Sequence, residues 1–303
     1  MINLGAGLAQ GELAALSAAF LWALASAVYS KLGQSLSSLL LNLSKGVVAV
    51  LLLLLTLAIH AEPIPAIPTM PFIALSLSGI VGIGFGDTLY FETLQCLGVR
   101  LTLLFGVLTP SITAVLALLL LHESLSGWAW VGMGLTLVGI AWVIQERTVG
   151  TVPAARSQMV RGVGLGLLSV LIFAASALLS RGALAETTVT PLWSAIIRLG
   201  AGVASLTIVA IAKPKALKGW QKLGHSAVGL PLAGAAFLGT YLGIWFQQIG
   251  FKYAPAGIAQ TLLATSPIFI LGMARLAGQK VSLQSWVGSA IALAGVSLLL
   301  ILG

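Results

Sequence analysis

Asp87 is the only aspartate in the sequence, and it lies inside an apolar segment that reads GIVGIGFGDTLYFETL. A carboxylate at bilayer depth costs about 2.5–3.5 kcal/mol and usually faces a cavity or a partner. Such a group can exchange protons or orient a substrate amine, and Gly84 and Gly86 leave room for water or substrate to approach it. The alternative is structural: Asp87 pairs with Lys45 or Arg198 to fix the packing.

Two basic residues also lie inside apolar segments. Lys45 and Arg198 each stand seven residues in from the start of the segments 38–59 and 191–212. Cations that line a cavity would attract a carboxylate or a phosphate on a substrate. In the structural alternative, their long side chains reach the membrane surface and keep only the charged end in water.

Aromatic rings recur on single helix faces in the middle of apolar segments. Trp22 and Tyr29 lie seven residues apart in the first segment, and Tyr241 and Trp245 share a helix face in a later one. Rings of this kind line apolar cavities that have a few polar groups, and the alternative is a belt at the membrane interface. These observations predict a substrate-binding site formed by Trp22, Lys45, Asp87, Tyr90, Arg198, Tyr241 and Trp245.

Two prolines interrupt apolar segments. Pro110 and Pro267 each remove a backbone donor, which kinks or breaks a helix. Neighbouring hydroxyl side chains can satisfy the carbonyl groups that are freed. Interrupted helices at corresponding places in two halves of a membrane protein mark a binding site or a hinge. We therefore expect Pro110 and Pro267 to act as hinges.

The composition indicates that helices in a membrane position all of these residues. Of 303 residues, 59% are hydrophobic and only 7% are charged, and the mean hydropathy is +1.09. A soluble domain has roughly 25% charged residues, whereas a membrane-spanning helix needs about 20 apolar residues. The connections are too short for a folded soluble domain, which excludes an extramembrane enzyme module. The ten predicted spans are approximately 11–31, 38–59, 71–91, 100–121, 127–144, 161–181, 191–212, 228–249, 257–275 and 284–302.

Enzymatic and nucleic-acid functions find little support in the residue inventory. His60, His122 and His225 lie in separate loops without the spacing of metal ligands. No nucleophilic side chain has a general base at a spacing that would predict a catalytic pair. Four lysines of the loop 213–222 contribute to the net charge of +8, and a basic loop beside anionic lipid explains them. We expect no catalytic residue, no cofactor, no metal ion and no nucleic-acid partner.

The chain contains an internal repeat. Segments Leu108–Ile140 and Thr265–Val296 share a proline near the start, a short polar loop, and the sequence W-V-G followed by a second glycine. Each half has five predicted spans. Because five is odd, the second half enters the membrane from the opposite side, which predicts an inverted repeat. The predicted halves are residues 1–150 and 151–303.

Small residues recur at helical spacing in the fifth span of each half. Such faces let two helix backbones approach closely in a membrane, so we expect a scaffold role. The two sets are Gly132-Thr136-Gly139 and Gly288-Ala292-Gly295.

These features together resemble the drug/metabolite transporter superfamily with two EamA-type domains. The resemblance covers approximately 11–145 and 161–302, and its specificity lies in the order of the features in the two halves. The second half has Gln279 where the first has Glu123, so a role of that acid is not shared. The features are Trp22 in the first span, Lys45 and Arg198 in the second spans, Tyr90-Phe91 and Trp245-Phe246 in the third spans, Pro110 to Glu123 in the fourth, and W-x-G at the start of the fifth.

The resemblance implies an all-α protein of ten transmembrane helices that moves small metabolites. The leading expectation is a secondary-active exporter of amino acids or related amphipathic compounds in a bacterial inner membrane, working by alternating access. Its partners would be the substrate, the lipid bilayer, and protons or a counter-substrate. The alternatives are an obligate exchanger of anionic, phosphorylated metabolites and a non-transporting membrane scaffold.

Two arguments disagree on the side of the termini. Basic residues gather in the loops that follow odd-numbered spans, and the positive-inside rule then places both termini outside. The superfamily resemblance implies termini in the cytoplasm.

Overall fold

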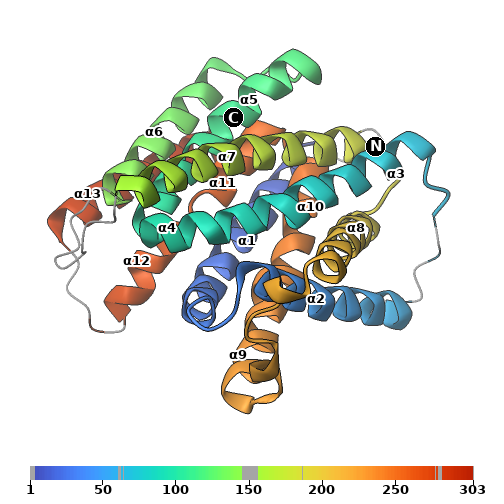
Figure 1. Cartoon of the computed structure of the whole chain (residues 1–303). Helices are drawn as coiled ribbons and strands as arrows, with labels where there is room; N and C mark the ends of the chain where they lie inside the picture. The colour runs from blue at the N-terminus through green and yellow to red at the C-terminus, as the bar shows by residue number, and fades with distance from the viewer. Residues whose placement is uncertain are drawn as a thin grey trace.

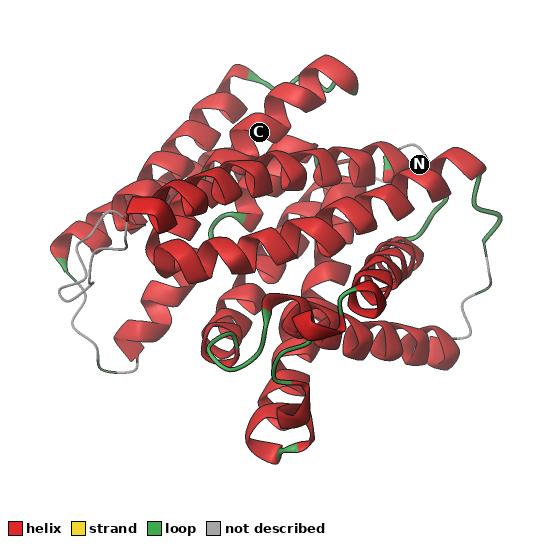
Figure 2. Ribbon diagram, in the orientation of Figure 1, coloured by secondary structure: helices red, strands yellow, loops and turns green. Residues whose placement is uncertain are grey.

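The structure is a computed structural model that describes residues 4–60, 63, 65–144, 156–185, 187–276, 278 and 282–302. The described part of the chain is a bundle of helices joined by short loops and contains no strand (Figures 1 and 2). Eight helical segments are long and apolar enough to cross a membrane, and 108–120 and 127–143 form two shorter apolar helices. The predicted boundary between the two halves, near residue 150, lies outside the described residues.

The first half runs through seven helical elements. The third of its predicted spans is made by three of them in unbroken succession, with a π-helical segment in the middle. The elements are α1 (Leu4–Leu32), α2 (Ser38–His60), α3 (Thr69–Ser78), η1 (Gly79–Gly86), α4 (Asp87–Gly106), α5 (Leu108–Leu120) and α6 (Gly127–Ile144).

The second half repeats this arrangement, adds two short 3-10 helices in the basic loop, and has two helices, α10 and α11, where the first half has the single helix α4. Its third span is also built around a π-helical segment. The elements are α7 (Arg156–Leu184), α8 (Pro191–Ala212), η2 (Pro214–Ala216), η3 (Trp220–Gly224), α9 (Ser226–Ala235), η4 (Ala236–Leu242), α10 (Gly243–Tyr253), α11 (Ala256–Leu263), α12 (Ser266–Leu276) and α13 (Leu283–Leu302).

Equivalent elements of the two halves contact each other in reciprocal pairs. α1 packs on η4 and α10, and α7 packs on η1 and α4. α2 packs on α8, with Leu39 clustered with Leu206 and Ala210, and Leu53 clustered with Leu192. The start of α2 therefore meets the end of α8, so these two equivalent helices are antiparallel.

The glycine faces of α6 and α13, which the sequence predicts to serve helix–helix contacts, pack on each other. The two helices lie side by side (Figure 1). A Cβ atom on Gly139 would lie 2.4 Å from the backbone nitrogen of Ala292, and one on Gly295 would lie 2.4 Å from that of Thr136. The scaffold role is confirmed, because side chains at these positions would force the backbones apart.

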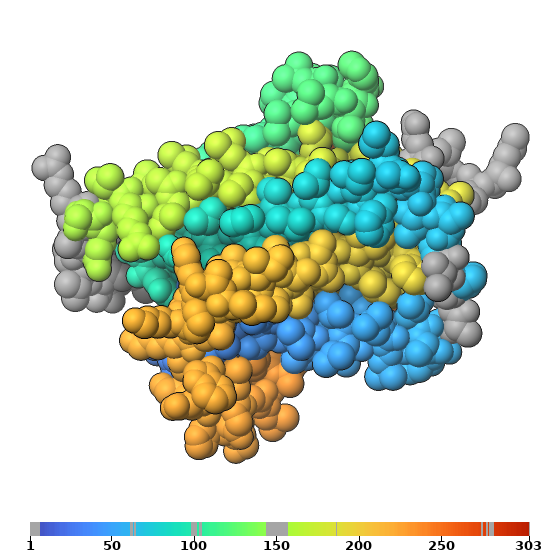
Figure 3. Space-filling view, turned by 45° about the vertical axis from the view of Figure 1, so that its right-hand side comes forward, coloured from blue at the N-terminus to red at the C-terminus, as the bar shows by residue number. Residues whose placement is uncertain are grey.

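Large apolar side chains cover much of the outside of the bundle. Leu51, Leu119 and Ile208 are more than 60% exposed although they lie within apolar helices. Lipid tails accept such surface, whereas water does not. The orange segment that contains α9 projects from the rest of the molecule (Figures 1 and 3).

Two local expectations are corrected. The connection expected between the spans 71–91 and 100–121 is helical, because α4 continues to Gly106. Pro110 and Pro267 do not lie in the middle of a helix: each lies in the first turn, Pro110 in α5 and Pro267 in α12. The first turn tolerates proline, since its N–H group would have no helical partner there. In both halves a helix does end just before the proline, α4 at Gly106 and α11 at Leu263.

Candidate functional site

The candidate site is centred on an ion pair between α2 and α4. Ser37 precedes α2, and its hydroxyl accepts a hydrogen bond from the Leu40 backbone N–H. Lys45 lies two helical turns after the start of α2, and its Nζ atom lies 2.5 Å from Oδ2 of Asp87. Asp87 is the first residue of α4 and directly follows η1. The side chains of Lys45 and Asp87 are 8% and 22% exposed, so this charge pair is largely removed from solvent.

Aromatic rings surround the Lys45 ammonium group. Its Nζ atom lies 5.2 Å from the ring centre of Phe91 and 5.7 Å from that of Tyr29. The Tyr29 and Phe91 rings pack edge to face with their centres 6.3 Å apart, and the ring centres of Tyr90 and Phe91 are 5.9 Å apart. A cation over ring faces is stabilised by the ring quadrupole, so the same walls would accept a substrate amine.

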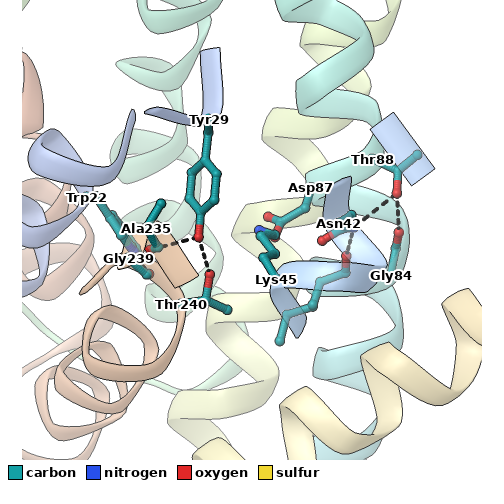
Figure 4. Close-up of polar contacts among 11 residues, drawn as sticks. Trp22, Tyr29, Asn42, Lys45, Gly84, Asp87, Thr88, Ala235, Gly239 and Thr240 are labelled. Atoms are coloured by element: carbon teal, nitrogen blue, oxygen red, sulfur yellow. Dashed lines mark hydrogen bonds and ion pairs between the residues drawn. The ribbon is translucent and has the colours of Figure 1, made fainter. Parts of the chain in front are cut away.

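Asn42 holds η1 in position beside the ion pair. Its Nδ2 atom donates to the carbonyl oxygen of Ile83 at 2.7 Å and to Oγ1 of Thr88 at 3.1 Å. Thr88 in turn donates to the Gly84 carbonyl at 2.8 Å (Figure 4). Buried backbone carbonyls need such donors. π-helical turns within α-helices are frequent at functional sites, and this one places Asp87 opposite Lys45.

Two side chains of α1 bind the corresponding π-helical segment of the second half. The hydroxyl of Tyr29 donates to the Ala235 carbonyl at 2.9 Å and lies 2.8 Å from Oγ1 of Thr240. Nε1 of Trp22 donates to the Gly239 carbonyl at 2.8 Å. Figure 4 shows Tyr29 between these contacts and the Lys45–Asp87 pair. Tyr29 therefore connects the ion pair of the first half to η4 of the second.

Arg198 lies in a separate, hydroxyl-lined position and does not bind Asp87. Its Nε atom donates to Oγ of Ser78 at 2.9 Å, Nη2 to Oγ of Ser176 at 3.1 Å, and Nη1 to Oε1 of Gln247 at 3.0 Å. Arg198 is 3% exposed, and no acid lies within 4.0 Å of it among the described residues. Its guanidinium group thus joins α3, α7 and α10.

Tyr241 and Trp245 form a third group, on the side of α2 and α8. Their ring centres are 6.0 Å apart. The hydroxyl of Tyr241 lies 2.7 Å from Oγ1 of Thr56, which itself donates to the Leu52 carbonyl, so Tyr241 is the donor to Thr56. The seven predicted site residues thus fall into four groups. Lys45, Asp87 and Tyr90 lie together, and Tyr241 lies with Trp245. Trp22 of α1 is bound to η4, and Arg198 stands alone.

The expectation that Gly84 and Gly86 leave room beside Asp87 is wrong. A Cβ atom on Gly84 would lie 2.5 Å from Oγ of Ser205, and one on Gly86 would lie 2.9 Å from the ring of Phe173. These glycines let α8 and α7 pack closely against η1. The absence of side chains at Gly84 and Gly86 therefore does not give water or substrate access to Asp87.

A second ion pair closes one end of the bundle. Glu123, which follows α5, pairs with Arg181 near the end of α7. Nη1 of Arg181 also donates to the carbonyls of Phe251 and Lys252, both at 2.9 Å, and Oε2 of Glu123 accepts from the Ala256 backbone N–H at 2.9 Å. We call this set the latch, and it ties α7 and the segment after α5 to the α10–α11 turn. Gln279 lies outside the described residues.

Sequence reasoning missed several of these contacts. Asn42 stands three residues before Lys45, and a search for polar neighbours one turn away could have found it. No signal marked Ser78 or Ser176, because serine is common in apolar helices. Among the described residues, no group of three His, Cys, Asp or Glu side chains could hold a metal ion.

Two surface pockets lie apart from these groups. One, of about 460 Å³, is formed by the basic loop around Lys218 and Trp220. The other is an open groove of about 400 Å³ between α1, α10 and α12, with apolar walls that include Phe20, Phe246 and Phe269. Neither pocket is lined by a predicted site residue.

The helix arrangement and the buried charges define a multi-pass integral membrane protein with two similar halves. The sequence model of the EamA-like transporter family matches residues 9–145 and 160–301, so it covers both halves. The chain therefore belongs to this family, within the drug/metabolite transporter superfamily, and is a membrane transporter rather than a member of an enzyme family.

A solved structure shares the fold. A chain described as "Crystal structure of protein" superposes with a TM-score of 0.77 at 15% sequence identity, and the match covers 96% of each chain. No curated protein matches the sequence.

Proposed function

We propose that this protein is a secondary-active exporter of small metabolites that carry both an amine and a carboxylate, such as amino acids and related amphipathic compounds. The observation that carries this proposal is the Lys45–Asp87 pair with its aromatic walls. A substrate of this kind offers Lys45 a carboxylate and Asp87 an ammonium group. Both protein charges therefore keep a partner when the substrate separates them, which avoids the large penalty for a buried, unpaired charge.

The transport cycle would be alternating access between two inverted five-helix halves in a bacterial inner membrane. The antiparallel packing of α2 on α8 supports the inverted relation, because equivalent helices of inverted repeats run in opposite directions. The breaks before Pro110 and Pro267 support hinges at equivalent places. Family membership speaks against a non-transporting scaffold.

Exchange of anionic, phosphorylated metabolites is the second candidate, and Arg198 favours it. This buried cation has hydroxyl and amide partners but no acid within reach among the described residues. An anionic substrate could supply the missing charge. The Lys45–Asp87 pair favours the first candidate, since it presents no net charge to a substrate.

Uptake into liposomes separates the two candidates. The purified chain is reconstituted and offered radiolabelled amino acids, amino-acid derivatives and phosphorylated sugars, with and without a pH gradient. The first proposal expects uptake of amino compounds and loss of that uptake in Asp87→Asn. Uptake of phosphorylated sugars alone, dependent on a counter-substrate, would overturn it.

A further inference from the structure

Glu12 is a buried acid in α1 that the proposed substrate site does not use. Its side chain is 3% exposed, and its Oε1 atom accepts no hydrogen bond from the described residues. The other described acids all have cationic partners: Asp87 with Lys45, Glu92 with Arg161, and Glu123 with Arg181. Glu12 is the exception, so its burial needs another explanation.

Among the described residues of the elements packed against α1, none carries a charge that compensates Glu12. On α10, Nζ of Lys252 is bound to the carbonyls of Thr187 and Val189, and Tyr253 contributes a phenol. Tyr241 of η4 is bound to Thr56, and the described parts of α9 and α11 carry no acid or cation. Arg275 of α12 is exposed, whereas α12 meets α1 in its first half, at Ser266 and Phe269.

Burial without a partner strongly disfavours a carboxylate but not a neutral carboxylic acid. An ionised group loses its hydration and receives nothing in return, whereas the protonated form has far less hydration to lose. Acids inside membrane segments are therefore commonly proton carriers.

The packing next to Glu12 connects it with the latch. A Cβ atom on Gly11 would lie 2.8 Å from the backbone nitrogen of Ala254, so α1 touches the α10–α11 turn backbone to backbone. Arg181 and Glu123 hold the same turn through the Phe251 and Lys252 carbonyls and the Ala256 N–H. A movement that separated the α10–α11 turn from Gly11 would bring water to the helical turn that carries Glu12.

We propose that Glu12 is the proton-binding site through which the transporter uses a proton gradient. Its carboxyl group holds a proton while the α10–α11 turn is packed on Gly11. When the turn moves away, the O–H bond ionises and the proton passes to water. Asp87, which is paired with Lys45, orients the substrate. This inference rests on the proposed transport function, because a proton site has a role here only if something is transported.

The first test reads protonation directly and needs no substrate. Infrared difference spectra of the purified full chain, recorded over a pH series, should show a carboxylic-acid C=O band that disappears as the pH rises. The band should be absent in Glu12→Gln and should shift in frequency in Glu12→Asp. It should persist in Asp87→Asn and in Glu92→Gln, a matched control at an exposed ion pair. A wild-type spectrum without the band, or an unchanged band in Glu12→Gln, would overturn the proposal.

The second test separates coupling from transport. With a substrate found in the liposome panel, Glu12→Gln should lose accumulation driven by a pH gradient and retain exchange of labelled for unlabelled substrate. Accumulation by Glu12→Gln equal to that of the wild type would overturn the role of Glu12. A wild-type protein that moves none of the panel compounds would overturn the proposed function, while the infrared titration still decides whether Glu12 binds the proton.

Discussion

Lys45 and Arg198 lie at the same position in equivalent helices, yet only Lys45 has an acidic partner. Each stands seven residues after the first residue of its helix, Ser38 in α2 and Pro191 in α8. When Tyr90-Phe91 is placed over Trp245-Phe246, the counterpart of Asp87 is Leu242. The duplication thus preserved the buried cation in both halves and the acid in one. We infer that the two halves have different tasks in the transport cycle.

The first prediction concerns the Lys45–Asp87 pair. Asp87→Asn should abolish uptake and lower stability by about 3 kcal/mol, because it leaves the Lys45 ammonium group buried without its partner. The double variant Lys45→Met/Asp87→Leu should recover most of the stability and none of the uptake, since no unpaired charge remains. Thermal unfolding in detergent and liposome uptake measure the two effects. Full uptake by Asp87→Asn would return the pair to a structural role.

The second prediction is that the predicted site residues share a water-accessible space. In a Cys96→Ala background, which removes the one cysteine of the chain, Trp22→Cys, Tyr90→Cys and Trp245→Cys should react with a water-soluble thiol reagent. Leu51→Cys is a matched control, because Leu51 is 62% exposed but on the outer surface of α2 where lipid would cover it. Failure of most site cysteines to react would refute a common cavity.

The sequence predicted the scaffold better than the contacts of the site. Periodic small residues revealed the α6–α13 face, since backbone approach depends on residue size alone. The Lys45–Asp87 pair was one of two open alternatives, because the pattern on separate helices does not say which cation an acid meets. Arg198 found hydroxyl and amide partners instead. Glu12 was overlooked, since nothing in an apolar segment shows that an acid at one position will lack a partner.

The third prediction concerns the α6–α13 contact. Gly139→Leu should lower the unfolding temperature strongly, because even a Cβ atom there would lie 2.4 Å from the Ala292 nitrogen. Gly134→Leu is the matched control on the same helix, since a Cβ atom at that position meets nothing within 4 Å. Differential scanning fluorimetry in detergent compares the two variants. Equal unfolding temperatures would show that the contact does not hold the helices together.

The last prediction is that the latch controls access to the α10–α11 turn. Glu123→Gln keeps an oxygen for the Ala256 N–H but removes the charge that binds Arg181. If the variant loses about 1.4 kcal/mol of closing energy, the open population rises about tenfold. A cysteine introduced by Ala254→Cys, in the Cys96→Ala background, should then react about tenfold faster with a water-soluble reagent, because Ala254 is fully buried when the turn is closed. Lys31→Gln is the matched control: Lys31 is the counterpart of Arg181 in the first half, is exposed, and binds no acid among the described residues.

Equal reaction rates for Glu123→Gln and the parent would show that the ion pair stabilises the fold without controlling access. If the reaction rate rises as much in Lys31→Gln as in Glu123→Gln, the effect comes from the change in net charge.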